Sequence, residues 1–125
     1  MAKGDTIVAV VNRTVVGTIT LARASSTHGA PFYDRPDVAS FGQFGVEPDL
    51  QAARIGSTLL ELVEALATEQ GVRELALDTS EHATHLIRFY TSRGYRFIEF
   101  AQWPEVNYRS MIFAKTLALA DGQNR

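Results

Sequence analysis

The segment from Val46 to Ser57 (VEPDLQAARIGS) joins an apolar, strand-like stretch to a strongly periodic helix. It ends in Arg54-Ile55-Gly56-Ser57, at the predicted start of that helix. The first turn of a helix leaves about four backbone N–H groups without an intrahelical partner and carries roughly half a positive charge. Phosphate binds readily at such a position. The segment therefore predicts an anion site, and the alternative is an ordinary helix start capped by Ser57.

Tyr90 is one of four tyrosines in the chain whose hydroxyl could donate a proton. It lies in a second periodic stretch, four residues before Gly94-Tyr95. A neutral phenol with a pKa of about 10 can donate a proton to a leaving group or stabilise it. Because Phe89 and Tyr90 adjoin each other in an apolar helix, an aromatic residue of the core is the alternative interpretation.

Two histidines share the start of that helix without making a convincing metal site. His82 and His85 lie on one face, and no third ligand stands at a suitable spacing. We interpret them, with Glu81, as solvated residues of a helix start. The sequence therefore predicts no metal.

The chain has 125 residues, a formal net charge of -2 and no cysteine. The length predicts a single domain, residues 1–125, with a substantial core. The charge and the lack of a basic run do not favour nucleic acid as a partner. The lack of cysteine excludes disulfides, thiolate metal sites and a cysteine nucleophile. The sequence shows no signal peptide or membrane-spanning run, so we expect a cytoplasmic protein without a membrane partner.

The elements that must position these residues follow from hydrophobic periodicity. Strands are expected at Thr6–Val11, Val15–Leu21, Ala39–Val46, Glu74–Leu77, Tyr95–Phe100 and Tyr108–Leu117, and helices from Ile55 to a stop at Gly71 and over about Ala83–Arg93. Ala22–Asp37 is interpreted as a long surface loop. The strand–helix–strand–helix–strand middle predicts parallel neighbours with helices on the sheet faces, whereas the flanking hairpins predict antiparallel pairs. The fold class is therefore α/β with a mixed sheet, and residues 118–125 form a polar, frayed tail.

Gly42 and Gly45 interrupt the predicted strand Ala39–Val46. Glycine weakens a strand interior and often marks a bulge or the close approach of another backbone. An irregular edge strand and a ligand-facing strand are both consistent with these two glycines.

The helix-start segment and Tyr90 together resemble a known family, the GCN5-related N-acetyltransferases. That family binds acetyl-CoA on a strand, loop and helix with the pattern V-x-P-x-x-[QR]-x-x-G-x-[GA]-x-x-L-L. This chain matches the pattern at Val46, Pro48, Gln51, Gly56, Leu59 and Leu60. A second family pattern, a tyrosine four residues before a glycine-aromatic pair, is matched by Tyr90, Gly94 and Tyr95. The resemblance extends from Thr6 to about Leu117.

This resemblance implies transfer of an acetyl group from acetyl-CoA, as co-substrate, to a primary amine by direct attack in a ternary complex. It implies that Phe44, Gly45 and Val46 face the pantetheine arm and that an N–H near Val46 stabilises the oxyanion. The pyrophosphate would be held by main-chain donors of Gln51, Ala52, Ala53, Arg54, Ile55, Gly56 and Ser57. Tyr90 would be the general acid for the leaving thiolate. The acceptor, a small molecule or a peptide, is not specified by the sequence.

The chain departs from the family pattern in two places. Arg54 stands where the first glycine is usual, which is harmful only if the position needs a positive φ, and its guanidinium could contact phosphate. Family members usually begin with a strand and two helices that wall the acceptor site, and here five residues precede the first predicted strand. A partner subunit could supply that wall, so a homodimer is a plausible assembly. The alternative function is a catalytically silent domain of this fold that binds CoA or serves in regulation or assembly.

The general base is not evident from the sequence. Glu47 adjoins the predicted site and is the candidate carboxylate. Ser40 lies where some relatives carry a glutamate, and a water chain could serve equally well. His28, in the long loop, and Trp103, in the loop before the last strand, are candidates for the acceptor side only.

Overall fold

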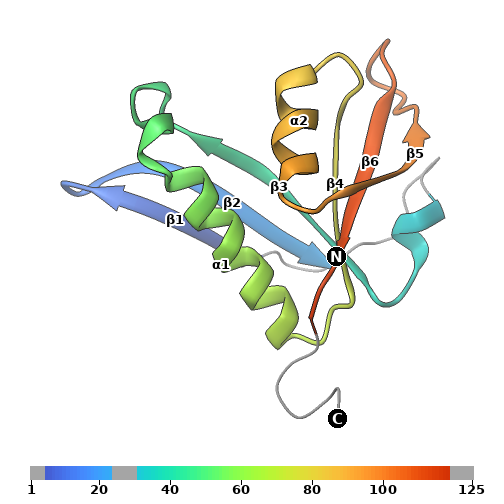
Figure 1. Ribbon diagram of the computed structural model, residues 1–125, viewed down its shortest axis with the longest axis horizontal. Helices are drawn as coiled ribbons and strands as arrows, with labels where there is room; N and C mark the ends of the chain where they lie inside the picture. Colours follow the sequence, from blue (N-terminus) through green and yellow to red (C-terminus); the bar gives the residue numbers. More distant parts are fainter. Residues whose placement is uncertain (1–4, 24–30, 119–125) are drawn as a thin grey trace.

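The computed structural model describes residues 5–23 and 31–118. Within them the strands and α-helices follow one another in the predicted order (Figure 1). The elements are β1 (Asp5–Val11), β2 (Thr14–Arg23), η1 (Pro31–Asp34), β3 (Val38–Val46), η2 (Pro48–Ala53), α1 (Ile55–Glu69), β4 (Glu74–Ser80), α2 (Thr84–Ser92), β5 (Arg96–Ala101) and β6 (Ser110–Thr116), where η marks a short 3₁₀ helix. The six strands form one sheet in the order β1-β2-β3-β4-β6-β5. The predicted mixed α/β class is confirmed.

The β1–β2 hairpin forms as predicted, with antiparallel pairing along both strands. Its connecting residues, Asn12 and Arg13, have φ values of 51° and 68°. Two consecutive residues with positive φ give a turn whose twist matches that of the flanking strands. The polar turn therefore closes the hairpin without splaying it.

The predicted long loop Ala22–Asp37 is shorter than expected where the structure describes it. β2 continues to Arg23, and η1 carries a buried Tyr33. Residues 24–30, with His28, lie outside the described residues, as does the predicted tail beyond Ala118. Tyr33 packs into a core cluster with Val38 and Ile112. Phe32 and Tyr33 are adjacent aromatic residues in an otherwise polar segment, so no apolar period indicated this anchor.

α1 packs on β1, β2 and β3 through the apolar face that its periodicity predicted. Leu59, Leu60, Val63 and Ala67 are buried along this face. Gly17 lies beneath the helix, and a β-carbon there would stand 3.1 Å from Cδ1 of Leu59. The glycine therefore sets how closely α1 approaches β2.

β3 and β4 are parallel neighbours for only three residue pairs, the last of which is Ser40↔Ala76. Beyond it β3 follows β2 to Val46, whereas β4 continues beside β6 to Ser80. Figure 1 shows the two strands side by side at one end and diverging toward the other. The prediction of parallel neighbours is wrong for β4 and β5, because β6 lies between them and is antiparallel to both. β6, the second strand of the β5–β6 hairpin, thus lies between β4 and β5 in the sheet.

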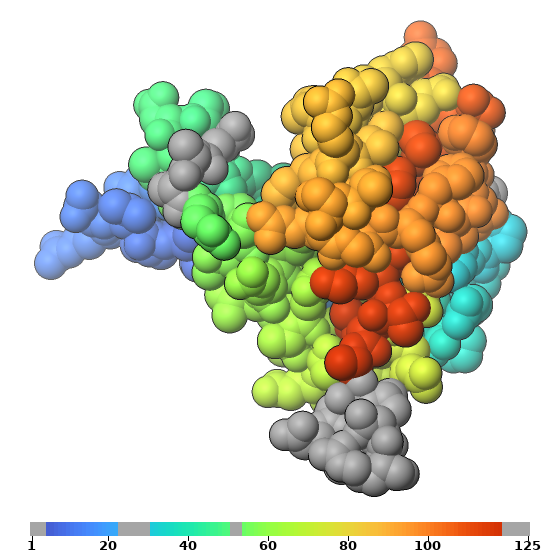
Figure 2. Space-filling model, in the orientation of Figure 1, coloured from blue at the N-terminus to red at the C-terminus, as the bar shows by residue number. Residues whose placement is uncertain are grey.

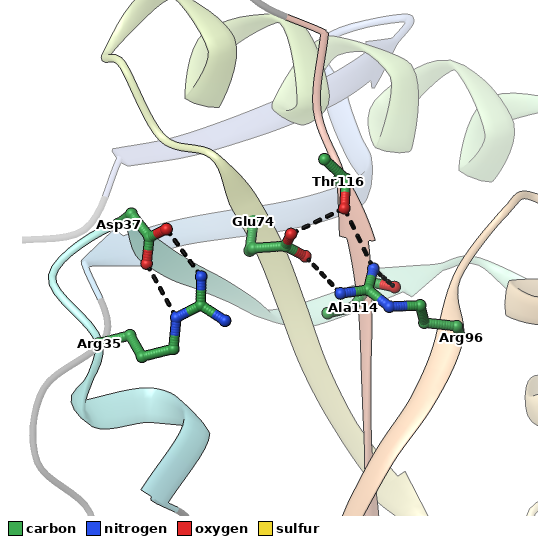
Figure 3. A network of polar contacts seen from close by, with 6 residues as sticks. All are labelled: Arg35, Asp37, Glu74, Arg96, Ala114 and Thr116. Carbon is green, nitrogen blue, oxygen red and sulfur yellow. Dashed lines mark hydrogen bonds and ion pairs between the residues drawn. The ribbon is translucent and has the colours of Figure 1, made fainter.

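Polar contacts hold the closed end of the β3–β4 pair. The backbone N–H groups of Arg73 and Glu74 both donate to the carbonyl oxygen of Asp37, at 2.9 and 3.1 Å. The buried carboxylate of Glu74 accepts hydrogen bonds from Arg96 at 3.0 Å and from Thr116 at 2.7 Å (Figure 3). A buried carboxylate is tolerated when its oxygens are paired in this way. The point from which the strands diverge is therefore tied to β5 and β6.

Candidate functional site

A cleft of about 400 Å³ lies between the end of β3, the start of α1 and α2. It is lined by Phe44, Gly45, Val46, Arg54, Gly56, Ser57, His85, Leu86, Phe89 and Tyr90. In Figure 2 a notch opens between the green part of the molecule and the yellow-to-orange α2, and the two parts meet below it. The predicted anion-binding segment and the predicted proton donor therefore meet in one place, where β3 has parted from β4.

Some predicted site residues do not line the cleft. Ile55 packs its side chain against the core, and residues 51–53 belong to η2 before the helix start. Glu47, the predicted base, is exposed, and its backbone N–H donates to the carbonyl of Val16 at 2.8 Å. Three lining residues, His85, Leu86 and Phe89, were not predicted. Leu86 stands four residues before Tyr90, and His85 stands four residues before Phe89. This spacing, which places each pair on one side of a helix, was the signal that could have found them.

Arg54 is the residue at which η2 ends and α1 begins, and its φ is 65° with ψ at 18°. These angles lie in the left-handed region, which a residue with a β-carbon adopts at a cost. The position thus has the backbone requirement that the family glycine would meet. Arg54 is also the N-cap and makes no side-chain cap, so the alternative in which Ser57 caps the helix is not seen. The first-turn N–H groups of α1 therefore remain suited to an anion.

Arg93 adds a second cation beside this helix start and was not singled out from the sequence. Its guanidinium donates to Oγ of Ser57 and stands over the ring of Phe89, 5.0 Å from the centroid. Arg93 contacts the first turn of α1 through Ser57, and Arg54 directly precedes that turn and lines the cleft. Both residues add positive charge to this end of the cleft, which favours phosphate. A basic residue directly before Gly94, where α2 ends, was the available signal.

β3 carries a bulge where it enters the cleft. Its register with β2 shifts between Thr18 and Thr20, and Gln43 opposite them has a φ of 49°. Thr18 Oγ1 donates to the Gln43 carbonyl at 2.7 Å, and Thr20 Oγ1 donates to the Gln43 side-chain oxygen at 3.1 Å. A β-carbon placed at Gly45, beyond the bulge, would meet nothing within 4 Å. The bulge therefore re-aims a stretch of strand that has room for a ligand along it.

Tyr90 lies in an aromatic cluster at the cleft and is 5% exposed. The rings of Phe41, Phe89 and Tyr95 surround it, with centroids 5.3 to 5.9 Å away. This burial raises the pKa of Tyr90 to about 12. Within the described part of the chain, no hydrogen bond engages its hydroxyl. The phenol is therefore protonated at neutral pH and available as a donor, although it is also a core aromatic.

A second hollow, of about 540 Å³, is bordered by the middle of α1, the end of α2 and β6. Two of the polar side chains that border it, Glu64 and Lys115, are paired with each other. Glu64 accepts hydrogen bonds from the Tyr95 hydroxyl at 2.7 Å and from the Lys115 ammonium at 3.2 Å. Because a helix start and a diverging strand border the first cleft and not this one, we place the candidate site in the first.

Residues 5–23 and 31–118 contain neither a metal-binding cluster nor a helix that could span a membrane. Nowhere in these ranges do three or more His, Asp or Glu side chains come together as a metal site. His85 instead lines the cleft. Neither α-helix of this part is long and apolar enough to cross a membrane.

Comparison with known proteins identifies one family and a set of similar folds. The sequence model described as "Acetyltransferase (GNAT) family" matches residues 2–95, whereas none of the curated proteins matches the chain. The ribosomal-protein-S18-alanine N-acetyltransferase of Escherichia coli is similar with a TM-score of 0.73 and 19% identity, over 98% of this chain and 74% of that one. A GNAT-family acetyltransferase of Staphylococcus aureus Mu50 gives 0.71 and 22%, over 92% and 68%. The PaiA N-acetyltransferase of Thermoplasma acidophilum, in complex with coenzyme A, gives 0.67 and 19%, over 89% and 59%.

Proposed function

The chain belongs to the GNAT family of acetyltransferases, and on this premise we propose that it transfers the acetyl group of acetyl-CoA to a primary amine. The observation that carries the proposal is the cleft, where the start of α1, the end of β3 and Tyr90 meet. Direct attack in a ternary complex is the proposed mechanism, since the chain has no cysteine to carry the acetyl group.

The residues around the start of α1 fit a diphosphate. Main-chain N–H groups over residues 51–57 would hold it, with Arg54 and Arg93 supplying charge. The pantetheine arm would lie along Phe44–Val46, which line the cleft, in the manner of an added strand. An N–H of this stretch is the proposed donor to the oxyanion of the tetrahedral intermediate.

Tyr90 would act on the leaving group. The amine nitrogen forms the new C–N bond, the C–S bond breaks, and its electron pair goes to sulfur. Because the pKa of Tyr90, about 12, exceeds that of a thiol, about 8.5, the phenol favours a hydrogen bond to the thiolate over complete proton transfer. Burial therefore makes Tyr90 a stabilising donor in the transition state.

Glu47 is the proposed acceptor of the amine proton, because it directly follows Val46 in the chain. It lies outside the set of cleft-lining residues, so a water would have to connect it to the amine. Glu47→Gln tests this role: a base should shift the acidic limb of the rate against pH, and a profile identical to that of the wild type would exclude it.

Thermal stabilisation with acetyl-CoA, CoA and ATP tests the proposed function, followed by free-thiol release with a panel of amines. We expect stabilisation by both CoA species and thiol release with at least one amine. Failure of both CoA species to stabilise the chain would refute acetyl-CoA binding. Stabilisation without turnover would support the catalytically silent alternative.

The homodimer and the cytoplasmic location stay predictions. The β1–β2 hairpin exposes apolar side chains that a second copy could cover, among them Val8, Val10 and Val15, which are 47% to 55% exposed. Sedimentation at micromolar concentration tests the dimer, and a monomer would contradict it.

A further inference from the structure

Tyr33, Asp78 and Trp103 meet on the side of the sheet opposite the α-helices. Side chains alternate along β4, so Leu77 packs in the core beneath the helices whereas Ala76 belongs to the cluster on the other side. Asp78 shares the face of Ala76. η1 brings Tyr33 to this face, and the β5–β6 loop brings Trp103. Three segments far apart in the sequence therefore converge on one carboxylate.

Two neutral donors fix the orientation of this carboxylate. The Tyr33 hydroxyl donates to Oδ1 of Asp78 at 3.2 Å, and the Trp103 indole N–H donates to Oδ2 at 3.1 Å. Tyr33 is buried and Trp103 is half-buried, whereas Asp78 itself is exposed. Since each carboxylate oxygen can accept more than one hydrogen bond, Asp78 retains accepting capacity toward solvent.

Among the described residues, Asp78 enters no ion pair. Glu99 adds a second carboxylate nearby, held by the backbone N–H of Phe32 at 3.0 Å. Burial, Asp78 and Glu99 together raise the pKa of Tyr33 above its usual value. An anionic group between aromatic rings is a setting that recognises ammonium ions.

Asp78 also stands at the opening between β3 and β4. Pairing of these strands ends at Ser40↔Ala76, and Asp78 is two residues farther along β4. The stretch of β3 that faces this opening lines the acetyl-CoA cleft from the helix side. A group bound at Asp78 would therefore lie across the open part of the sheet from Tyr90.

We propose that Asp78, oriented by Tyr33 and Trp103, binds the ammonium group of the acceptor and sets a preference for cationic alkylamines over uncharged arylamines. The inference rests on the proposed function and names the substrate class of the same site. Alkylamines have pKa values near 10 and arrive protonated at neutral pH. Asp78 forms no covalent bond in this role, and the ammonium loses its proton before attack.

Steady-state thiol release with n-butylamine and with aniline, at pH 7.5, tests this role in the wild type, Asp78→Asn and Asp78→Glu. We expect Asp78→Asn to raise the KM for butylamine about tenfold or more, with the KM values for aniline and acetyl-CoA within about twofold of the wild type. Asp78→Glu keeps the charge and should recover part of the loss. Glu69→Gln is the matched control, because it removes one exposed carboxylate at the far end of α1.

Each other outcome overturns the inference in a distinct way. An unchanged butylamine KM in Asp78→Asn refutes the role of Asp78 and leaves the proposed function standing. Equal rises in the KM values for butylamine, aniline and acetyl-CoA mean that the substitution disturbs the fold. In that case Trp103→Phe, which removes one donor and keeps the carboxylate, must raise the butylamine KM alone or the inference fails. No thiol release by the wild type with any amine overturns the proposed function and the inference with it.

Discussion

Replacing Arg54 by glycine should raise the stability of the protein and lower its affinity for acetyl-CoA. The left-handed backbone at Arg54 costs a residue with a β-carbon about 1–2 kcal/mol. Glycine removes that cost but loses about 0.5–1 kcal/mol through the greater freedom of the unfolded chain. The balance lies between about 0 and 1.5 kcal/mol, and its midpoint of about 0.75 kcal/mol corresponds to a rise in Tm of about 2–4 °C for a domain of this size. Loss of the guanidinium should raise the Kd for acetyl-CoA about tenfold, because charge-assisted contacts to phosphate are strong.

Two further variants separate backbone strain from charge. Arg54→Ala keeps the β-carbon and loses the guanidinium, so it should lose affinity without gaining stability. Arg13→Gly is the matched control, because Arg13 has a φ of 68° in the exposed hairpin turn and does not line the cleft. It should gain stability with no change in affinity. Circular dichroism melting gives the Tm values, and isothermal titration calorimetry gives the Kd values.

Two results would refute this reasoning. A gain in Tm for Arg13→Gly but not for Arg54→Gly would show that the start of α1 is not left-handed in solution. Equal affinity of the wild type and Arg54→Ala for acetyl-CoA would show that the guanidinium makes no useful contact with phosphate.

Three other predictions follow from burial. Tyr90→Phe should lower kcat about 100-fold with the Kd for acetyl-CoA within about twofold; thiol-release kinetics and calorimetry measure the two, and an unchanged kcat would exclude the donor role. Stability should fall as pH rises above about 10. Burial raises the pKa values of Tyr33, Tyr90 and Tyr95 in the folded protein, so they keep their protons there. The unfolded chain releases these protons above about pH 10, which favours unfolding. Urea unfolding from pH 8 to 12 checks this, and Tyr90→Phe should make the loss less steep, whereas a flat curve for the wild type would contradict it. Gly17→Ala should destabilise the fold by about 1–3 kcal/mol, since its β-carbon would stand 3.1 Å from Leu59; an unchanged urea midpoint would argue against such close packing.

The parts of the fold that could be predicted have local signals. The two polar turn residues after Val11 and the apolar period of α1 each report on one element and its immediate neighbours. The pairing of β5 could not be predicted in this way, because the strand that separates it from β4 comes later in the chain. Tyr33 is a similar case, since its burial depends on contact with residues of β3 and β6.

The same distinction holds for the candidate site. The motif around Gly56 and the spacing of Tyr90 from Gly94 are sequence-local, and the structure brings both to one cleft. The positive φ at Arg54 could not be predicted, because an arginine gives no sign of a left-handed backbone. The sequence showed only that an arginine would be unfavourable there if the position needed a positive φ. Arg93 reaches Ser57 across two helices, and Trp103 reaches Asp78 across 25 positions of sequence. Because the two residues of each contact belong to different elements, the residue pattern of a single helix or strand cannot predict it.

The short pairing of β3 and β4 has a consequence for engineering the protein. A longer ladder between the two strands would add backbone hydrogen bonds and would by itself stabilise the sheet. It would also close the opening between Asp78 and the cleft. Substitutions that stabilise this protein should therefore be sought around Glu74 and Arg96, at the closed end of the pair. Variants selected for thermostability alone are expected to gain strand pairing at the open end and to lose turnover.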